Sequence, residues 1–77
     1  MSEKIGTLQM QPSGRWAVCR PGRMPVEITS GEVFRVAVRG LPGLQLTRME
    51  YDREATNGYY SVDGFWLYDG VAAATAD

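Results

Sequence analysis

Histidine is absent from this 77-residue sequence, and cysteine occurs once, at Cys19. Without histidine there is no Ser-His or Cys-His nucleophile pair and no imidazole general base. A single thiol forms no internal disulfide, and with no histidine beside it nearly every structural zinc site is excluded. The sequence therefore predicts no catalytic residue, no metal and no cofactor, and it disfavours an enzyme.

Long apolar runs are also missing. The uninterrupted apolar stretches are only a few residues long, far below the roughly 20 residues that span a bilayer. The first residues, Met1–Lys4, lead into a mixed stretch, so no signal peptide is expected. The lone Cys19 fits a reducing compartment. We therefore expect a cytoplasmic protein that does not associate with membranes.

Neither positive nor negative charge predominates in the sequence. Eight basic side chains, of which only Lys4 is a lysine, stand against nine acidic ones, for a net charge of −1. Residues 1–40 nevertheless hold six basic and three acidic side chains, and residues 41–77 hold two and six. Such asymmetry marks an interaction surface, or it disappears where the two halves fold over each other.

The length predicts a single domain over residues 1–77. A domain of this size hides only about 60% of the surface of its unfolded chain. With neither a disulfide nor a metal to add support, self-association is the remaining source of stability. We therefore expect a homo-oligomer, with a dimer favoured.

Turn-forming residues punctuate the chain at short intervals. They occur at 12–14, 21–22, 30–31, 40–43, 57–58, 63–64 and 69–70. No interval between them has both the length and the pattern of a sizeable helix. Short segments with this spacing are typical of a small β-barrel or β-sandwich.

Between the turns, apolar and polar residues alternate as they do in strands with one buried face. The clearest case is 33–39, where Phe34, Val36 and Val38 form an apolar stripe and Arg35 and Arg39 lie on the opposite face. Further strands are predicted at 5–10, 15–19, 26–28 and 44–51.

Two local signals refine the second half of the chain. The apolar positions of 44–51 change parity along the segment, which predicts a β-bulge near Thr47–Arg48. Asp63-Gly64 separates 59–62 from 65–68, and a two-residue Asp-Gly loop between such segments predicts a hairpin.

The last residues, 71–77, form a short C-terminal tail that prefers helix locally. It is too short to be stable as a helix alone, so we expect it to dock or to fray. The strands together predict an all-β protein, a small antiparallel SH3-like barrel of five to six short strands. An OB-type barrel is the alternative, but it usually carries a helix between strands, for which there is no room.

The aromatic residues of 59–62 and 65–68 are the strongest functional lead. Neighbours in a strand face opposite sides, so one ring of each adjacent pair points outward. The residues predicted to line the core are Tyr60, Val62, Phe65 and Leu67. The predicted interaction surface comprises Tyr59, Trp66 and Tyr68, with Arg35 and Arg39 beside them.

An outward aromatic patch of this kind has three interpretations. It is a contact between copies of the chain, a site for a ligand or protein partner, or a surface that the tail or a loop covers. Rings beside arginines also bind single-stranded nucleic acid by stacking and by phosphate contacts. The net negative charge disfavours this last function. We expect a small non-catalytic binding or accessory module that self-associates.

Several motifs occur in a recognisable order. They are Gly6-Thr7-Leu8, Gly14-Arg15-Trp16, Thr29-Ser30-Gly31-Glu32, Arg48-Met49-Glu50, Gly58-Tyr59-Tyr60, and Leu67 ahead of Gly70. Over about residues 5–70 the chain resembles a family of short uncharacterised bacterial proteins with a small SH3-like barrel. Genes of that family are often carried on plasmids and other mobile elements, and an integron cassette is one origin that the resemblance suggests. The family has no assigned reaction, so the resemblance implies a fold and no site residues.

One enzyme class shares the predicted fold and the small size. The type II dihydrofolate reductases are SH3-like barrels that build one active pore per tetramer, with a Val-Gln-Ile-Tyr motif on the pore-lining strand. This chain has Leu44-Gln45-Leu46-Thr47, which resembles that motif but lacks its tyrosine. An oligomeric small-ligand-binding protein or pore enzyme of this kind is therefore a disfavoured alternative.

Overall fold

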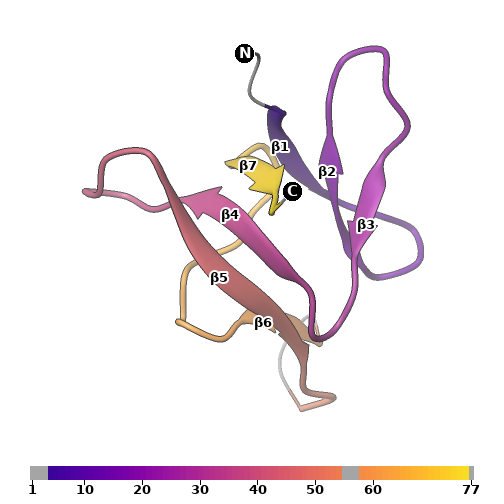
Figure 1. The fold of residues 1–77 in the computed structure, drawn as a ribbon. Coiled ribbons are helices and arrows are strands. Elements are labelled where there is room, and N and C mark those ends of the chain that lie inside the picture. The colour runs from indigo at the N-terminus through magenta and orange to yellow at the C-terminus, as the bar shows by residue number, and fades with distance from the viewer. Residues whose placement is uncertain (1–3, 55–57, 77) are drawn as a thin grey trace.

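The computed structural model describes residues 4–54 and 58–76, and every regular element in them is a strand (Figure 1). The strands are β1 (Ile5–Met10), β2 (Trp16–Cys19), β3 (Val26–Ile28), β4 (Val33–Ala37), β5 (Leu44–Tyr51), β6 (Tyr59–Ser61) and β7 (Ala72–Thr75). All of their pairings are antiparallel. The described part of the chain has no helix that could cross a membrane. The predicted all-β class is confirmed.

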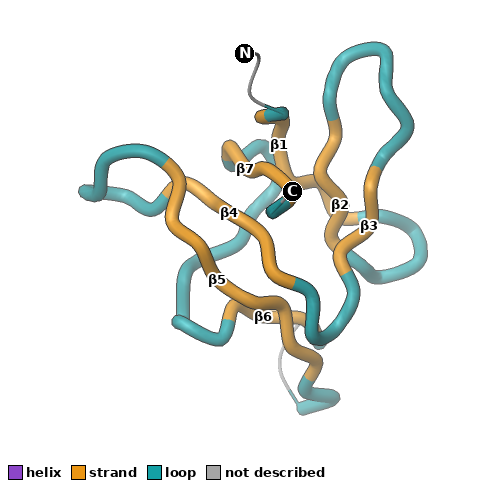
Figure 2. The backbone as a smooth tube through the Cα atoms, viewed as in Figure 1, coloured by secondary structure: helices purple, strands orange, loops and turns teal. Residues whose placement is uncertain are grey.

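The strands form one open sheet in the order β3-β2-β1-β7-β4-β5-β6. Its edges are β3 and β6, and within residues 4–54 and 58–76 no pairing joins them. The predicted SH3-like barrel is therefore not confirmed, because the sheet does not close. Figure 2 shows the β2–β3 and β4–β5 loops extending away from the sheet.

The sheet curls around one core although it stays open. Three strands separate β3 from β4 in the sheet, a distance of about 19 Å if the sheet were flat. Residues 29–32 alone connect the two strands, and the Glu32 amide donates to the Thr29 carbonyl at 3.1 Å. The ends of so tight a turn lie within about 7 Å of each other. The resulting curl gathers one core cluster of Leu8, Trp16, Val18, Ile28, Phe34, Val36, Met49, Val71 and Ala73.

A β-bulge contributes to the curl of the sheet. It lies in the segment ahead of β4, opposite β5, and not in β5 itself as the sequence predicts. β5 pairs with β4 in unbroken register over residues 44–48. Ahead of β4, the Met49 amide donates to the Glu32 carbonyl at 2.8 Å, and the Gly31 amide donates to the Met49 carbonyl at 2.7 Å. Gly31 has a φ of 90°, the left-handed conformation that the first residue of such a bulge adopts. The prediction of a bulge near Thr47–Arg48 is wrong, because the extra residue belongs to the facing segment.

Residues 65–68 do not form the second arm of a hairpin. The chain does turn after β6, where the Gly64 amide donates to the Ser61 carbonyl at 2.9 Å. The next residues pair with no strand, and Phe65 and Leu67 pack against the core instead. A turn is present, but its central residues are Val62 and Asp63, one position before the predicted Asp63-Gly64 loop. The predicted strand at 65–68 is absent, because these residues form no ladder with a described strand.

The C-terminal tail docks, and over residues 72–75 it does so as a strand. β7 pairs with β1 on one side and with β4 on the other. Ala73 and Ala74 are fully buried there. These residues form a strand despite their local preference for helix, because an isolated helix of this length is unstable. As a strand they gain backbone hydrogen bonds to β1 on one side and to β4 on the other.

Replacing Ala73 by Asp is expected to unfold the protein. Ala73 is fully buried, and a carboxylate placed there loses its hydration without gaining a partner. That cost is comparable with the total stability of about 5 kcal/mol typical of small domains. Ala76→Asp adds the same charge at an exposed position and is expected to leave the melting temperature nearly unchanged. Circular dichroism during heating compares the two, and equal melting temperatures would contradict a central β7.

Glu32 caps the turn between β3 and β4. Its Oε1 accepts hydrogen bonds from the Thr29 amide and from the Thr29 hydroxyl, each at 2.7 Å. These two bonds, the amide first, lower the pKa of Glu32 below its ordinary value. The ionised carboxylate therefore stabilises the folded chain.

Glu32→Gln is expected to lower the free energy of unfolding at neutral pH, by an amount that shrinks in acid. With the folded-state pKa lowered, the stabilisation is complete above the unfolded-state value of about 4.3 and is lost as the pH falls through the folded-state pKa. Urea denaturation across this range measures the difference from the wild type. Thr29→Val, which removes one of the two donors, is expected to show a smaller loss with the same pH dependence. A loss that does not change with pH would contradict this account.

Candidate binding site

Two aromatic rings lie side by side on the outside of residues 65–68. Phe65 and Leu67 pack against the core, whereas Trp66 and Tyr68 are exposed. Trp66 is 77% exposed, more than any other aromatic side chain in the described part of the chain. The two ring centroids are 5.1 Å apart, with the planes inclined by 52°, an arrangement in the favourable range for aromatic pairs. The core contacts of Phe65 and Leu67 therefore hold the ring pair in place.

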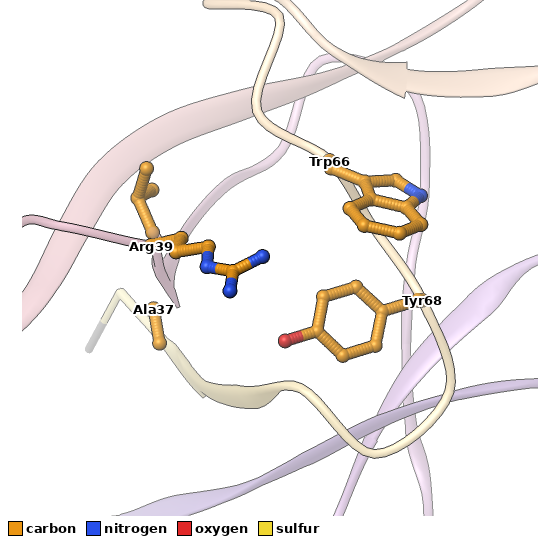
Figure 3. A pocket seen from close by; sticks show the side chains of 5 residues that line it. Ala37, Arg39, Trp66 and Tyr68 are labelled. Carbon is orange, nitrogen blue, oxygen red and sulfur yellow. The ribbon is translucent and has the colours of Figure 1, made fainter.

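The ring pair forms one wall of a groove whose opposite wall follows the end of β4. That opposite wall consists of Ala37, Val38 and Arg39. The hollow between the walls has a volume of about 400 Å³, within the range of about 300–1,000 Å³ of ligand sites. Figure 3 shows the Arg39 side chain reaching across the hollow toward Trp66 and Tyr68. These five residues are called the aromatic groove below.

The aromatic groove offers three kinds of contact. The rings present flat faces, Ala37 and Val38 add a small apolar wall, and Arg39 brings a positive charge with several N–H donors. Within residues 4–54 and 58–76, no hydrogen bond or ion pair occupies the Arg39 guanidinium. None of the five lining residues is a carboxylate, a thiol or an imidazole. This set of groups is suited to binding a flat or apolar group next to an anionic one.

Tyr59 lies outside the aromatic groove. Its side chain is half-buried against the core, and its ring centroid is 4.9 Å from that of Tyr51. Arg15 Nε donates to the Tyr59 hydroxyl at 3.3 Å, and this hydrogen bond raises the pKa of Arg15 above its ordinary value. Tyr60 is exposed instead. The prediction that Tyr59 faces outward and Tyr60 inward is wrong.

A buried polar contact sets the phase of β6. Ser61 lies opposite Met49 and is buried, with its hydroxyl 2.7 Å from the hydroxyl of Thr47. The Thr47 hydroxyl in turn donates to Asp63 Oδ2 at 2.7 Å. Because strand positions alternate, a buried Ser61 turns Tyr59 inward. The sequence does not indicate which residues of β6 face inward, since a serine at a core position does not contribute to an apolar pattern.

Arg35 lines a different hollow. Its Nη2 donates to the Thr75 carbonyl at 3.2 Å, and its Nε is buried without a hydrogen-bond partner in the described chain. This second hollow, of about 360 Å³, is also lined by Ile5, Gly43, Leu44 and Ala72. Arg35 therefore does not act together with the aromatic groove.

The structure thus brings three of the five predicted surface residues together. Arg39, Trp66 and Tyr68 line one groove, whereas Tyr59 and Arg35 lie elsewhere. Ala37 and Val38 complete the groove, and the sequence alone gives no sign that the end of β4 faces residues 66–68. This juxtaposition depends on how the chain returns from β6 to β7.

The chain has no match among protein-family models, curated proteins or solved structures. The resemblance to small proteins of mobile elements therefore stays a prediction. Within residues 4–54 and 58–76, no three acidic or cysteine side chains gather where they could hold a metal ion. The geometry of the aromatic groove is the basis for the proposed function.

Proposed function

We propose that this protein is a small non-catalytic binding module that self-associates and holds a segment of a partner protein in its aromatic groove. The observation that carries the proposal is the meeting of Trp66, Tyr68 and Arg39 at one hollow. Tryptophan, tyrosine and arginine are the residue types that contribute most of the binding free energy at protein interfaces.

The groove chemistry suggests the nature of the bound segment. A proline or another apolar side chain fits between the ring pair and the wall formed by Ala37 and Val38. An acidic side chain next to it suits Arg39, whose guanidinium forms bidentate hydrogen bonds with carboxylates. Extended proline-containing segments bind to aromatic-lined grooves at a low cost in conformational entropy. The proposed occupant is therefore an extended, acidic, proline-containing segment.

Fold relationship, location and origin belong to the same proposal. A curled antiparallel sheet of short strands around one core supports an SH3-like relationship, with the seam between β3 and β6 left open. The lone Cys19 supports a reducing cytoplasm. The motif order supports a gene carried on a mobile element, which the gene neighbourhood tests directly.

A short peptide such as acetyl-Glu-Pro-Leu-Pro-Glu-amide is expected to bind to the wild-type protein in the micromolar to millimolar range. Amide and indole chemical shifts in NMR spectra report the binding, with the largest changes at Trp66, Tyr68 and Arg39. Trp66→Ala and Arg39→Ala are each expected to weaken binding by about tenfold or more, as truncation of a central interface residue does.

Arg23→Ala is the matched control for this titration. Arg23 is an exposed arginine of the β2–β3 loop and does not line the groove. Its removal is expected to leave the peptide affinity unchanged. Equal losses for Arg23→Ala and Arg39→Ala would show a general charge effect and contradict the groove as the site.

Single-stranded nucleic acid is a second candidate occupant, favoured by the ring pair beside an arginine. Binding of an oligothymidylate would quench Trp66 fluorescence by base stacking. Among the described residues that line the groove, Arg39 is the one cation. The logarithm of the affinity is therefore expected to fall with the logarithm of salt concentration with a slope of about −0.7, as for one phosphate contact. A flat titration at low salt would eliminate this candidate.

A further inference from the structure

A second exposed surface lies on the side of β4, β5 and β6 that points away from the core. Its residues alternate along the strands with buried ones, and Leu46 is the most exposed of them, at 62%. This surface, called the outer face below, is formed by Val33, Leu46, Arg48, Glu50, Tyr60 and Val62. Arg35, opposite Leu46, lies on the same side of β4, but its guanidinium donates to the Thr75 carbonyl. Four of the six are large apolar side chains, each between 42% and 62% exposed.

Strand register makes the outer face continuous. Val33 lies opposite Arg48, and the Val62 amide donates to the Arg48 carbonyl at 2.9 Å. Arg48 therefore lies between two valines in one row across the three strands. Glu50 and Tyr60 lie opposite each other in the adjacent row on the same face. One pair of opposite charges thus stands at the centre of an apolar patch.

The Arg48–Glu50 ion pair carries no net charge, but its positive and negative ends lie at different positions along β5. Arg48 Nε is 2.6 Å from Glu50 Oε2, and the Ser30 hydroxyl donates to Glu50 Oε1 at 3.2 Å. Suppose that a second copy packs its outer face against the outer face of the first and is related to it by a two-fold axis. This axis lies between the two facing sheets and runs perpendicular to their strands. Arg48 of each copy then lies over Glu50 of the other. Contacts of this two-fold kind use the same surface on both partners.

We propose that the outer face is the contact between two copies of this chain, related by that two-fold axis. The inference rests on the self-association in the proposed function and gives it a surface of its own. Two sheets that pack face to face lie about 10 Å apart and interdigitate their apolar side chains. No residue of the aromatic groove belongs to the outer face, so both grooves stay open in the dimer.

The β3 edge is a poorer candidate for association. Hydrogen-bonded positions alternate along a strand, so the register with β2 points the backbone groups of Pro25, Glu27 and Thr29 away from the sheet. Pro25 has no N–H, Glu27 carries a charge, and the Thr29 amide already donates to Glu32. Proline, charge and a satisfied donor are the features that protect an edge from strand addition.

Charge reversal tests the two-fold contact. Arg48→Glu sets two pairs of glutamates against each other across the interface, and Glu50→Arg sets two pairs of arginines against each other. Each variant alone is expected to raise the dimer dissociation constant by about tenfold or more. An equimolar mixture of the two variants restores opposite charges at both contacts. Sedimentation equilibrium is expected to show a mixed dimer about as tight as the wild type.

Two controls accompany the reversals. Arg23→Glu makes the same change in the exposed β2–β3 loop and is expected to leave the dimer intact. Leu46→Ser is expected to weaken the dimer without charge reversal, and thermal unfolding confirms that each variant is folded. Recovery on mixing also excludes misfolding as the cause of dissociation.

The outcomes separate this interface from the proposed function. A wild type that stays monomeric into the millimolar range would overturn both self-association and the outer-face contact, and peptide binding at the groove would be unaffected. A dimer that survives both reversals would overturn the outer face alone. If Trp66→Ala dissociates the dimer and neither charge reversal does, the contact between the two copies lies at the aromatic groove and the outer-face proposal is wrong.

Discussion

The pairing of β7 with both β1 and β4 is the contact on which the rest of the structure depends. On one side of β7 lie β1, β2 and β3, and on the other lie β4, β5 and β6. Each set of three is built from strands that follow one another in the chain, but the two sets meet in the sheet through β7. The small side chains of Ala73 and Ala74 are fully buried there, so the last strand completes the core that the others line.

The aromatic groove follows from the same constraint. After β6, at the edge of the sheet, the chain has to cross to the centre before it becomes β7. It crosses over the core, which takes up Phe65 and Leu67 and leaves Trp66 and Tyr68 outside. Because β7 pairs with β4, the crossing segment runs past the end of β4 and its Arg39. The groove is therefore positioned by the topology of the sheet.

The two surfaces of the molecule have different chemistry and lie on different segments. The aromatic groove combines rings with Arg39, a cation that makes no ion pair with the described residues, and this is the basis for proposing a partner of opposite charge. The outer face combines apolar side chains, Tyr60 among them, with an ion pair of no net charge, and this is the basis for proposing a second copy of the chain as its partner. The proposed two-fold dimer would carry two grooves, and a partner with two matching segments would gain affinity from binding to both at once.

The sequence by itself determined the all-β class, most strand positions and the outward direction of Trp66 and Tyr68. These properties are local, because turn residues and period-two alternation act between near neighbours. Tertiary structure decided the central strand at 72–75, whose residues prefer helix until β1 and β4 offer hydrogen bonds on both sides. It also decided which side chains of β6 face the core, because the buried Ser61 hydroxyl requires its hydrogen bond with the Thr47 hydroxyl. Both outcomes depend on partners distant in the chain, which no local pattern encodes.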